Sequence, residues 1–284
     1  MILRNLQNEY VKQLSEMYEP DEAAAIFAAF AMHHLQLDRA AFQSALNKSI
    51  DDRFIDLSIR TLIKLAGGYP LQHLTGETRF YGLDLAVNGD VLIPRPETEE
   101  LVDWVAQTIR SEKNEKTPLS VMDFCTGSGC IAIALKKNFP EMHMSALDLS
   151  EAALRTARMN ANRHRTDIRF ILSDINDYAG EIPLDLIISN PPYIPDAEAA
   201  NMHINVLMHE PQMALFVPDD EPLGFYEVIG EIAAADLKPG GSLFFEINPN
   251  FARAVVELLY SFGFKSVELR KDMHGKERMV RAVK

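Results

Sequence analysis

The stretch VMDFCTGSGCIAI, residues 121–133, decides the fold. It begins as an apolar strand, turns at glycines and continues as a helix. Gly127 and Gly129, followed by Ala132, match the pattern G-x-G-x-x-A, in which glycines let a ligand approach the backbone and a helix N-terminus presents free N–H groups. Asp148 lies nineteen residues after Gly129, at the end of the next predicted strand, where a carboxylate can accept both hydroxyls of a ribose. The stretch therefore predicts the binding of an adenosine-containing cofactor.

Strands and helices alternate on the C-terminal side of this stretch. An apolar run such as 183–190 indicates a parallel strand that is covered on both faces. The last two strands, 264–272 and 277–284, are joined by a short turn and predict an antiparallel pair. The strands before them are predicted over 119–125, 141–150, 167–174, 183–190 and 242–248. The alternation predicts an α/β fold with a Rossmann-like, doubly wound, mostly parallel sheet.

The N-terminal part of the sequence has a different pattern. Helical periodicity predicts a small bundle of four short helices. Residues 77–88 predict a β-hairpin that turns at Gly82, and residues 89–112 predict a short strand, a turn between prolines and an amphipathic helix. The charged stretch 112–118 is interpreted as a link into a second domain. We divide the sequence into a helical domain (1–70), a hairpin linker (71–95) and an α/β domain (96–284).

The composition bounds the class of protein. The sequence has 284 residues, of which 47% are hydrophobic, enough for one large domain with a small one. It has no apolar run long enough to span a bilayer and no signal-peptide core, so we expect a cytoplasmic protein without membrane contact. Cys125 and Cys130 predict neither a disulfide framework nor a zinc site, and we expect no metal. The net charge of −13 argues against a polyanionic partner and suits a small ligand or a basic partner.

Two cofactors contain adenosine and fit this pattern, NAD and S-adenosylmethionine. Asp123 lies two residues before the loop, where its charge would repel a pyrophosphate and attract the ammonium and sulfonium of S-adenosylmethionine. Asp123 therefore favours S-adenosylmethionine. Asp174 ends the third predicted strand, where its carboxylate either accepts from the adenine amino group or caps a loop.

The stretch IISNPPYIPD, residues 187–196, supplies a second set of groups. Asn190 follows the fourth predicted strand, at the same sheet edge as the glycine loop. Pro191 and Pro192 fix φ and remove two donors, which leaves the amide oxygen of Asn190 and the backbone oxygen of Pro191 as rigid acceptors. Such a pair suits a planar NH2 group, and Tyr193 adds a flat face beside it. Two fixed acceptors can aim the nitrogen of an amide or aromatic amine at a methyl sulfonium.

Several segments resemble known methyltransferases. Five of them are similar to segments of class I S-adenosylmethionine-dependent methyltransferases that modify planar amino groups: DFCTGSG, LDLS, SNPPY, EPQMAL and FFEIN. Residues 68–104, which include LIPRPETE, more narrowly resemble the release factor glutamine methyltransferase (HemK/PrmC) family, and the resemblance covers nearly the whole sequence. It implies methyl transfer to the glutamine amide of the Gly-Gly-Gln motif of peptide chain release factors. It also implies that the helical domain docks the release factor. From the net charge we expect no direct binding of nucleic acid, and we expect a monomer, although the sequence leaves the oligomeric state open.

Site residues follow from the motifs and the resemblance together. The candidate catalytic residues are Asn190, Pro191, Pro192 and Tyr193. The candidate cofactor-binding residues are Asp123, Cys125, Thr126, Gly127, Ser128, Gly129, Asp148, Leu149, Asp174, Ile175 and Asn190. Three more residues match family positions near the pocket without a defined role: Arg95, which alternatively braces the turn, Thr98 and Glu246.

The sequence departs from the family pattern at two positions. Cys125 replaces the usual first loop glycine, and we expect it to adopt an ordinary strand-end conformation rather than a positive φ. Ile175 replaces an aromatic residue, which weakens the case for stacking on adenine there. Three alternatives remain: a nucleic-acid amino methyltransferase, which the net charge disfavours, an NAD-dependent oxidoreductase, and an adapter that kept the fold without catalysis.

Overall fold

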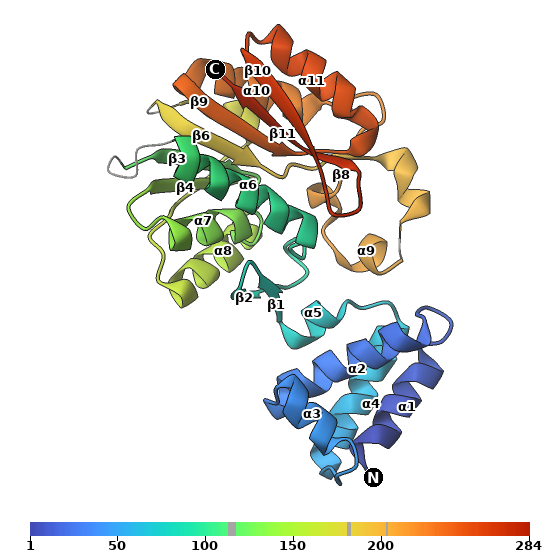
Figure 1. The fold of residues 1–284 in the computed structure, drawn as a ribbon. Helices are drawn as coiled ribbons and strands as arrows, with labels where there is room; N and C mark the ends of the chain where they lie inside the picture. The colour runs from blue at the N-terminus through green and yellow to red at the C-terminus, as the bar shows by residue number, and fades with distance from the viewer. Residues whose placement is uncertain (113–117, 181–182, 203) are drawn as a thin grey trace. The chain divides into compact units, whose positions relative to one another are not determined.

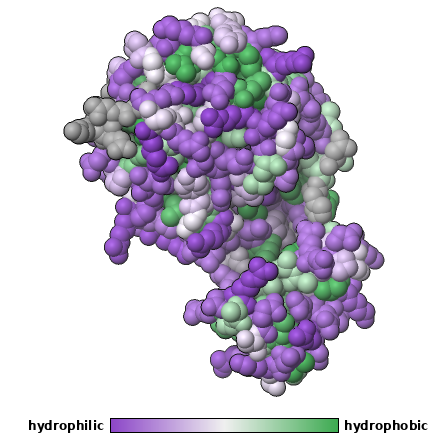
Figure 2. All heavy atoms as spheres, in the orientation of Figure 1, coloured by the Kyte–Doolittle hydropathy of each residue, from purple (hydrophilic) through white to green (hydrophobic). Residues whose placement is uncertain are grey.

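The computed structural model describes residues 1–112, 118–180, 183–202 and 204–284. Contacts divide the protein into two units. The first unit contains Met1–Gly76 and the short helix α9 (Ile204–His209), and the second contains Glu77–Met202 and Glu210–Lys284. In the view of Figure 2 the surface is mostly hydrophilic. The first unit encloses one large hydrophobic cluster and the second unit encloses two.

The first unit is helical, as predicted. Its core is built around the aromatic side chains of Tyr10, Phe27 and Phe30, and the Tyr10 hydroxyl donates to the backbone O of Ser58 at 2.8 Å. Its helices are α1 (Leu3–Gln13), α2 (Pro20–Leu35), α3 (Arg39–Ala45), α4 (Asp52–Ala66) and α5 (Leu71–Thr75). The bundle of four helices is confirmed, and the short α5 is additional.

Helix α9 belongs to the first unit although its sequence lies within the α/β part of the protein. The Asn205 side chain donates to the Tyr18 hydroxyl. The His209 ring stacks on Tyr69 with centroids 3.8 Å apart, and its Nε2 lies 3.3 Å from the backbone O of Gly67. The backbone therefore leaves the second unit after Met202 and returns to it at Glu210.

The second unit contains a seven-stranded sheet in the order β10-β11-β9-β6-β3-β4-β5 (Figure 1). The strands are β3 (Ser120–Phe124), β4 (His143–Asp148), β5 (Arg169–Leu172), β6 (Leu184–Ser189), β9 (Leu237–Glu246), β10 (Ser266–Lys271) and β11 (Glu277–Val283). The pairs among β3, β4, β5, β6 and β9 are parallel, and β11 pairs antiparallel with β9 and β10. The strand order reverses at β3, so the predicted doubly wound, mostly parallel sheet is confirmed.

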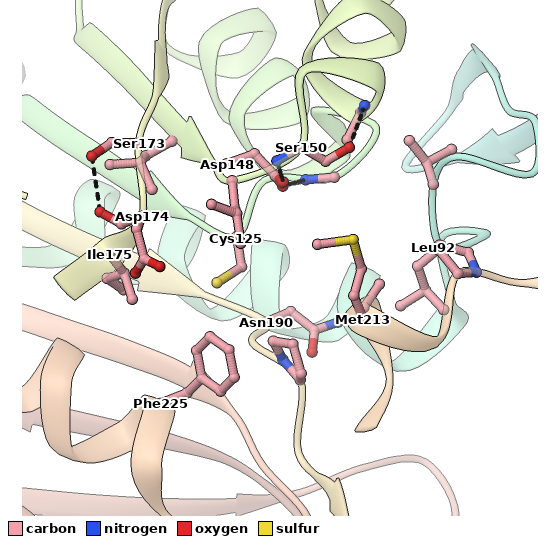
Figure 3. A pocket seen from close by; sticks show the side chains of 18 of the residues that line it. Leu92, Cys125, Asp148, Ser150, Ser173, Asp174, Ile175, Asn190, Met213 and Phe225 are labelled. Carbon is pink, nitrogen blue, oxygen red and sulfur yellow. Dashed lines mark hydrogen bonds between the residues drawn. The ribbon is translucent and has the colours of Figure 1, made fainter. Parts of the chain in front are cut away.

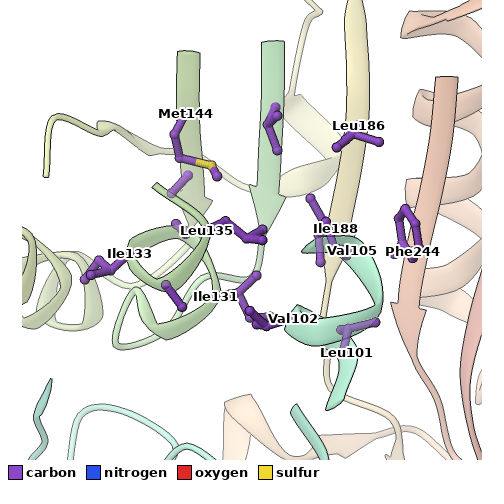
Figure 4. Packing of buried hydrophobic residues seen from close by; sticks show 14 of the residues in the cluster. Leu101, Val102, Val105, Ile131, Ile133, Leu135, Met144, Leu186, Ile188 and Phe244 are labelled. Atoms are coloured by element: carbon purple, nitrogen blue, oxygen red, sulfur yellow. The ribbon is translucent and has the colours of Figure 1, made fainter. Parts of the chain in front are cut away.

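Helices cover both faces of the sheet. One face packs against α6 (Pro96–Glu112), α7 (Cys130–Asn138) and α8 (Glu151–His164), and the other against α10 (Gly224–Asp236) and α11 (Ala252–Ser261). Leu186 and Ile188 of β6 point into the core between the sheet and the helices α6 and α7, which Figure 4 shows. Ile187 points into the core between the sheet and the helices α10 and α11. Successive residues of a strand face opposite sides, which explains why this strand is apolar throughout.

Short elements complete the second unit. The predicted hairpin is formed by β1 (Glu77–Phe80) and β2 (Leu83–Ala86), with positive φ at Tyr81 and Gly82 as a two-residue turn requires. The buried Asn160 of α8 bonds both the N and the O of Ala86 and also the O of Ser128, so it joins the hairpin to the glycine loop. The remaining elements are β7 (Ile194–Pro195), β8 (Phe216–Val217) and the 3-10 helices Ile175–Asp177, Asp196–Asn201, Gln212–Ala214 and Pro249–Phe251.

Two predictions about connecting segments differ from the structure. Within the stretch 112–118, residues 113–117 lie outside the described part of the protein, but the elements on either side, α6 and β3, belong to one unit, so this stretch does not link two domains. The short strand predicted after the hairpin is absent, because the described residues 91–95 form no strand. Pro94 in this segment lacks an N–H donor, and Ile93 N donates to the carboxylate of Glu210 at 3.1 Å instead of to a strand.

Candidate functional site

A pocket opens at the carboxyl ends of β3, β4, β5 and β6, where the strand order reverses. Figure 3 shows Asp174 and Ile175 at one end, Leu92 at the other and Asn190 between them. All lining residues come from the second unit: Asp90, Val91, Leu92, Cys125, Gly127, Leu147, Asp148, Leu149, Ser150, Ala153, Ser173, Asp174, Ile175, Asn176, Asn190, Pro192, Pro211, Met213, Ala214 and Phe225.

The glycine loop supplies the floor of the pocket at the end of β3. Cys125 and Gly127 line the pocket, and Gly129, at φ 81°, is the N-cap of α7. A Cβ built on Gly127 would have no protein atom within 4 Å, whereas one on Gly129 would lie 3.0 Å from Ile133 Cδ1. Gly127 thus leaves space for a ligand beside the backbone, and Gly129 allows helices α7 and α8 to pack closely.

The expected conformation of Cys125 is wrong. Its φ is +58°, in the left-handed region that costs a side chain free energy. A glycine would adopt this φ without cost, whereas the cysteine is strained in it.

Substituting the two cysteines will show this strain. We expect Cys125→Gly to be more stable than Cys125→Ala by about 1 kcal/mol, because only glycine adopts positive φ without cost. At Cys130, which lies in the helix α7, the order reverses and alanine is favoured by about 1 kcal/mol. Free energies of unfolding from urea titrations of the four variants test this. The same order at both positions would contradict the strain.

Asp148 ends β4 and is held by two backbone donors. Gly127 N donates to its Oδ2 at 2.8 Å and Ser150 N to its Oδ1 at 2.9 Å. Burial raises the pKa of this carboxyl, and the backbone N–H groups oppose that rise. Both oxygens keep further lone pairs, so the carboxylate can accept the two hydroxyls of a ribose.

The end of β5 carries Asp174 and Ile175. Asp174 Oδ1 accepts from the N and the Nδ2 of Asn176 at 2.9 and 2.8 Å, and these bonds lower the pKa of the carboxyl. The carboxylate is therefore a loop cap, and it also lines the pocket, so its bond to adenine stays a prediction. Ile175 and Phe225 give this end of the pocket an apolar wall.

The stretch after β6 divides between the pocket and the core. Asn190 and Pro192 line the pocket, whereas Pro191 is buried away from it. Tyr193 packs against the core on the α10 side, and its hydroxyl donates to Glu246 Oε1 at 2.9 Å. Burial, with the charge of Glu246, raises the pKa of Tyr193. The predicted flat face of Tyr193 beside the substrate stays a prediction.

Two buried polar residues, Thr98 and Glu246, lie behind Asn190. Asn190 Nδ2 donates to Thr98 Oγ1 at 3.2 Å, and Thr98 Oγ1 donates to Glu246 Oε2 at 2.7 Å. Thr98 and Glu246 are each 2% exposed. Burial raises the pKa of Glu246, and the bonds from Thr98 and Tyr193 oppose this rise. Both residues matched family positions in the sequence, but nothing local there indicates that they meet.

A second buried carboxylate holds the segment at the Leu92 end of the pocket. Arg95 Nη2 donates to Glu210 Oε1 at 2.5 Å, and Ile93 N donates to the other oxygen. The Glu210 side chain is 1% exposed. This ion pair fixes the stretch 91–95 to the segment that continues into Pro211 and Met213, so Arg95 braces the turn.

Asp123 lies beneath the loop and does not line the pocket. It is fully buried, and Thr126 Oγ1 donates to its Oδ2 at 2.6 Å. Burial raises the pKa of Asp123 to about 7. Thr126, Ser128 and Gly129 belong to the loop but do not line the pocket. The predicted attraction of Asp123 for a bound cation stays a prediction.

The pKa of Asp123 predicts a pH dependence of stability. Its ordinary value is 3.8, so between about pH 4 and 7 the unfolded carboxyl ionises and the buried one does not. Stability is therefore lost as the pH rises through this window, by roughly 4 kcal/mol for a shift of this size. Asp123→Asn removes this contribution, so in ligand-free protein the free energy of unfolding of the variant will rise relative to that of the wild type between about pH 4 and 7. Parallel pH profiles of the two proteins would refute the assignment.

Several pocket residues were missed from the sequence. Phe225, Leu92 and Met213 are apolar residues near turns, and such residues usually belong to a core. The segments LIPRPETE and EPQMAL, which contain Leu92 and Met213, were the available signal, because the family resemblance singled them out without giving them a role.

Comparisons with solved structures support the fold. A methyltransferase from Pyrococcus furiosus superposes with a TM-score of 0.52 at 19% identity, covering 72% of this chain and 90% of that one. A 16S rRNA N2 methyltransferase from T. thermophilus, in complex with AdoMet and guanosine, gives a TM-score of 0.51 at 18% identity, covering 73% of this chain and 49% of that one. These likenesses show the fold of class I methyltransferases.

Comparisons of sequence define the family. Residues 100–217 match the model of the methyltransferase small domain. The release factor glutamine methyltransferase of Flavobacterium psychrophilum is 39% identical over 99% of both chains. That of Bacteroides thetaiotaomicron is 36% identical, covering 96% of this chain and 97% of its relative. With this identity along its full length, the chain belongs to the release factor glutamine methyltransferase family.

Proposed function

We propose that this protein transfers the methyl group of S-adenosylmethionine to the side-chain amide nitrogen of the glutamine in the Gly-Gly-Gln motif of peptide chain release factors. The observation that carries this proposal is the place of Asn190, whose amide lies in the wall of the pocket that the glycine loop and Asp148 form. Such a substrate places the reaction in the cytoplasm.

The pocket fits S-adenosylmethionine. The space beside Gly127 lacks any protein atom where a Cβ would stand, which allows a ligand to lie against the backbone. Asp148 would hold the ribose, and Ile175 and Phe225 would enclose the adenine. The cofactor supplies a methyl group on a positively charged sulfur.

The role of the protein is to aim the glutamine nitrogen. Asn190 Oδ1 would accept one N–H bond of the amide, which fixes the direction of the NH2 group. The backbone O of Pro191 stays a predicted second acceptor, and Pro191 itself is buried and does not line the pocket. An amide nitrogen is a poor nucleophile, so holding it in line with the methyl group supplies most of the acceleration, without a strong base.

The three parts defined from the sequence would divide the work. The helical domain (1–70) docks the release factor, the hairpin region (71–95) connects the parts, and the α/β domain (96–284) carries out the transfer. A nucleic-acid amino methyltransferase would need positive charge to hold phosphates, and the net charge of −13 opposes that. In the described residues, no helix has the length and hydropathy to cross a bilayer.

The proposal is tested by mass spectrometry of a purified release factor after incubation with the protein and S-adenosylmethionine. We expect the Gly-Gly-Gln peptide to gain the mass of one methyl group, with fragmentation placing it on the glutamine side chain. A release factor whose motif glutamine is replaced by alanine is the control and should stay unmodified. Methylation of both proteins, or of neither, would overturn the proposal.

A further inference from the structure

The polar groups behind Asn190 form a series of hydrogen bonds that ends at a carboxylate. Asn190 Nδ2 bonds Thr98 Oγ1 at 3.2 Å, and Thr98 Oγ1 bonds Glu246 Oε2 at 2.7 Å. Tyr193 donates to the other oxygen of Glu246 at 2.9 Å. These residues come from the start of α6, the loop after β6 and the end of β9, so three separate elements converge on one buried carboxylate.

The carboxylate fixes the direction of every bond in this series. Glu246 accepts a hydrogen bond at each oxygen, from Thr98 Oγ1 at Oε2 and from the Tyr193 hydroxyl at Oε1, so the one proton of the Thr98 hydroxyl points at Glu246. Thr98 Oγ1 can then only accept from its other neighbour. The atom of Asn190 that faces Thr98 must therefore be the nitrogen, and the Asn190 oxygen must face the pocket.

We propose that Thr98 and Glu246 are positioning residues that select the orientation of the Asn190 amide, an inference that rests on the proposed function. An asparagine amide turned by half a rotation would present its own NH2 group to the NH2 group of the substrate. Two donors cannot bond each other, so the turned amide would neither bind nor aim the glutamine.

Thr98→Val tests the proposal, since valine keeps the shape and removes the hydroxyl. We expect kcat/KM for the release factor to fall by about tenfold, the value of one hydrogen bond. Thr98→Ser restores the hydroxyl and should stay within about threefold of the wild type. Thr108→Val is the matched control, because Thr108 is a buried threonine of the same helix α6 outside the pocket.

A merely structural role would lower stability or cofactor affinity, so both are measured in all three variants. Unchanged affinity for S-adenosylhomocysteine and an unchanged Tm, with loss of turnover only in Thr98→Val, support the proposal. Equal loss in the valine and serine variants, or full turnover in Thr98→Val, overturns it.

Substrate selectivity gives a second readout. The wild type should bind a release factor with glutamine in the motif better than one with glutamate, because the Asn190 oxygen requires a donor. Glu246→Leu frees the Thr98 proton to bond the Asn190 oxygen, which turns the amide. We expect the preference for glutamine over glutamate, measured by calorimetry with S-adenosylhomocysteine present, to fall by about tenfold in this variant. An unchanged preference in a folded Glu246→Leu protein counts against the proposal.

Hydrogen exchange separates this inference from the proposed function. In 15N-labelled protein the Asn190 side-chain amide protons should exchange about tenfold faster in Thr98→Val than in the wild type, whatever the substrate. If the wild type methylates no release factor, the proposed function fails and the exchange rates still decide the orientation. Equal exchange in both proteins would overturn the inference directly.

Discussion

Replacing Asn190 with alanine will lower kcat for methylation of a release factor by about 100- to 1000-fold, the usual effect of removing a preorganised polar group from a reacting centre. The Asn190 side chain lies in the pocket wall, and its nitrogen is bonded to Thr98. Alanine removes the acceptor that fixes the glutamine NH2 group but leaves the glycine loop and Asp148 in place. Affinity for S-adenosylmethionine should therefore stay within about threefold of the wild type.

Calorimetry and a radiolabelled methyl assay measure the two effects separately. Asn138→Ala is a matched control, because Asn138 ends α7, outside the pocket, and its side chain donates to the backbone O of Ala134. Normal turnover by Asn190→Ala would remove the basis of the proposed function. Equal loss of turnover and of cofactor affinity would instead show that Asn190 acts in cofactor binding, the other role predicted for it, rather than in aiming the substrate.

Replacing Asp148 with alanine will weaken the binding of S-adenosylmethionine by about 100-fold, since two hydrogen bonds to a charged acceptor are lost. The bonds from Gly127 N and Ser150 N disappear with them, so the loop also loses its anchor. We expect the dissociation constant measured by calorimetry to rise by about 100-fold. We expect only a small change in Tm.

Glu151→Ala is the control for charge at this position. Glu151 lies three residues further on, is exposed, pairs with Arg158 and does not line the pocket. Its removal should leave the affinity for cofactor unchanged. An unchanged affinity in Asp148→Ala, or an equal loss in both variants, would show that Asp148 does not hold the ribose.

The sheet and the glycine loop were predictable because their signals are local. The strand at residues 121–124, the turn glycines and Asp148 follow one another closely in the sequence, and their spacing alone indicates how they meet. Asn190 was predictable in the same way, because the carboxyl ends of adjacent parallel strands share an edge. In the structure β3 and β6 are neighbours, and Phe124 pairs with Ser189, so the next residues, Cys125 and Asn190, lie side by side.

Other features depend on contacts that no local pattern records. Thr98 and Glu246 are separated by 148 residues, and only the folded sheet brings them together. Phe225 resembles a core residue until the start of α10 places it at the pocket. The prediction for the φ of Cys125 was wrong because one residue cannot show which conformation its neighbours impose on it.

The excursion between β6 and β8 has a consequence for how this protein can be taken apart. The backbone passes from one unit to the other three times, at Gly76, near Met202 and at Glu210. Pro192, which precedes the excursion in the sequence, and Pro211, which follows it, both lie in the pocket wall. A gene that begins after Gly76 would encode a catalytic fragment that still carries α9 without the helices on which it packs. The residues of the two units alternate along the sequence, so the units must be inherited, expressed and engineered as a single piece.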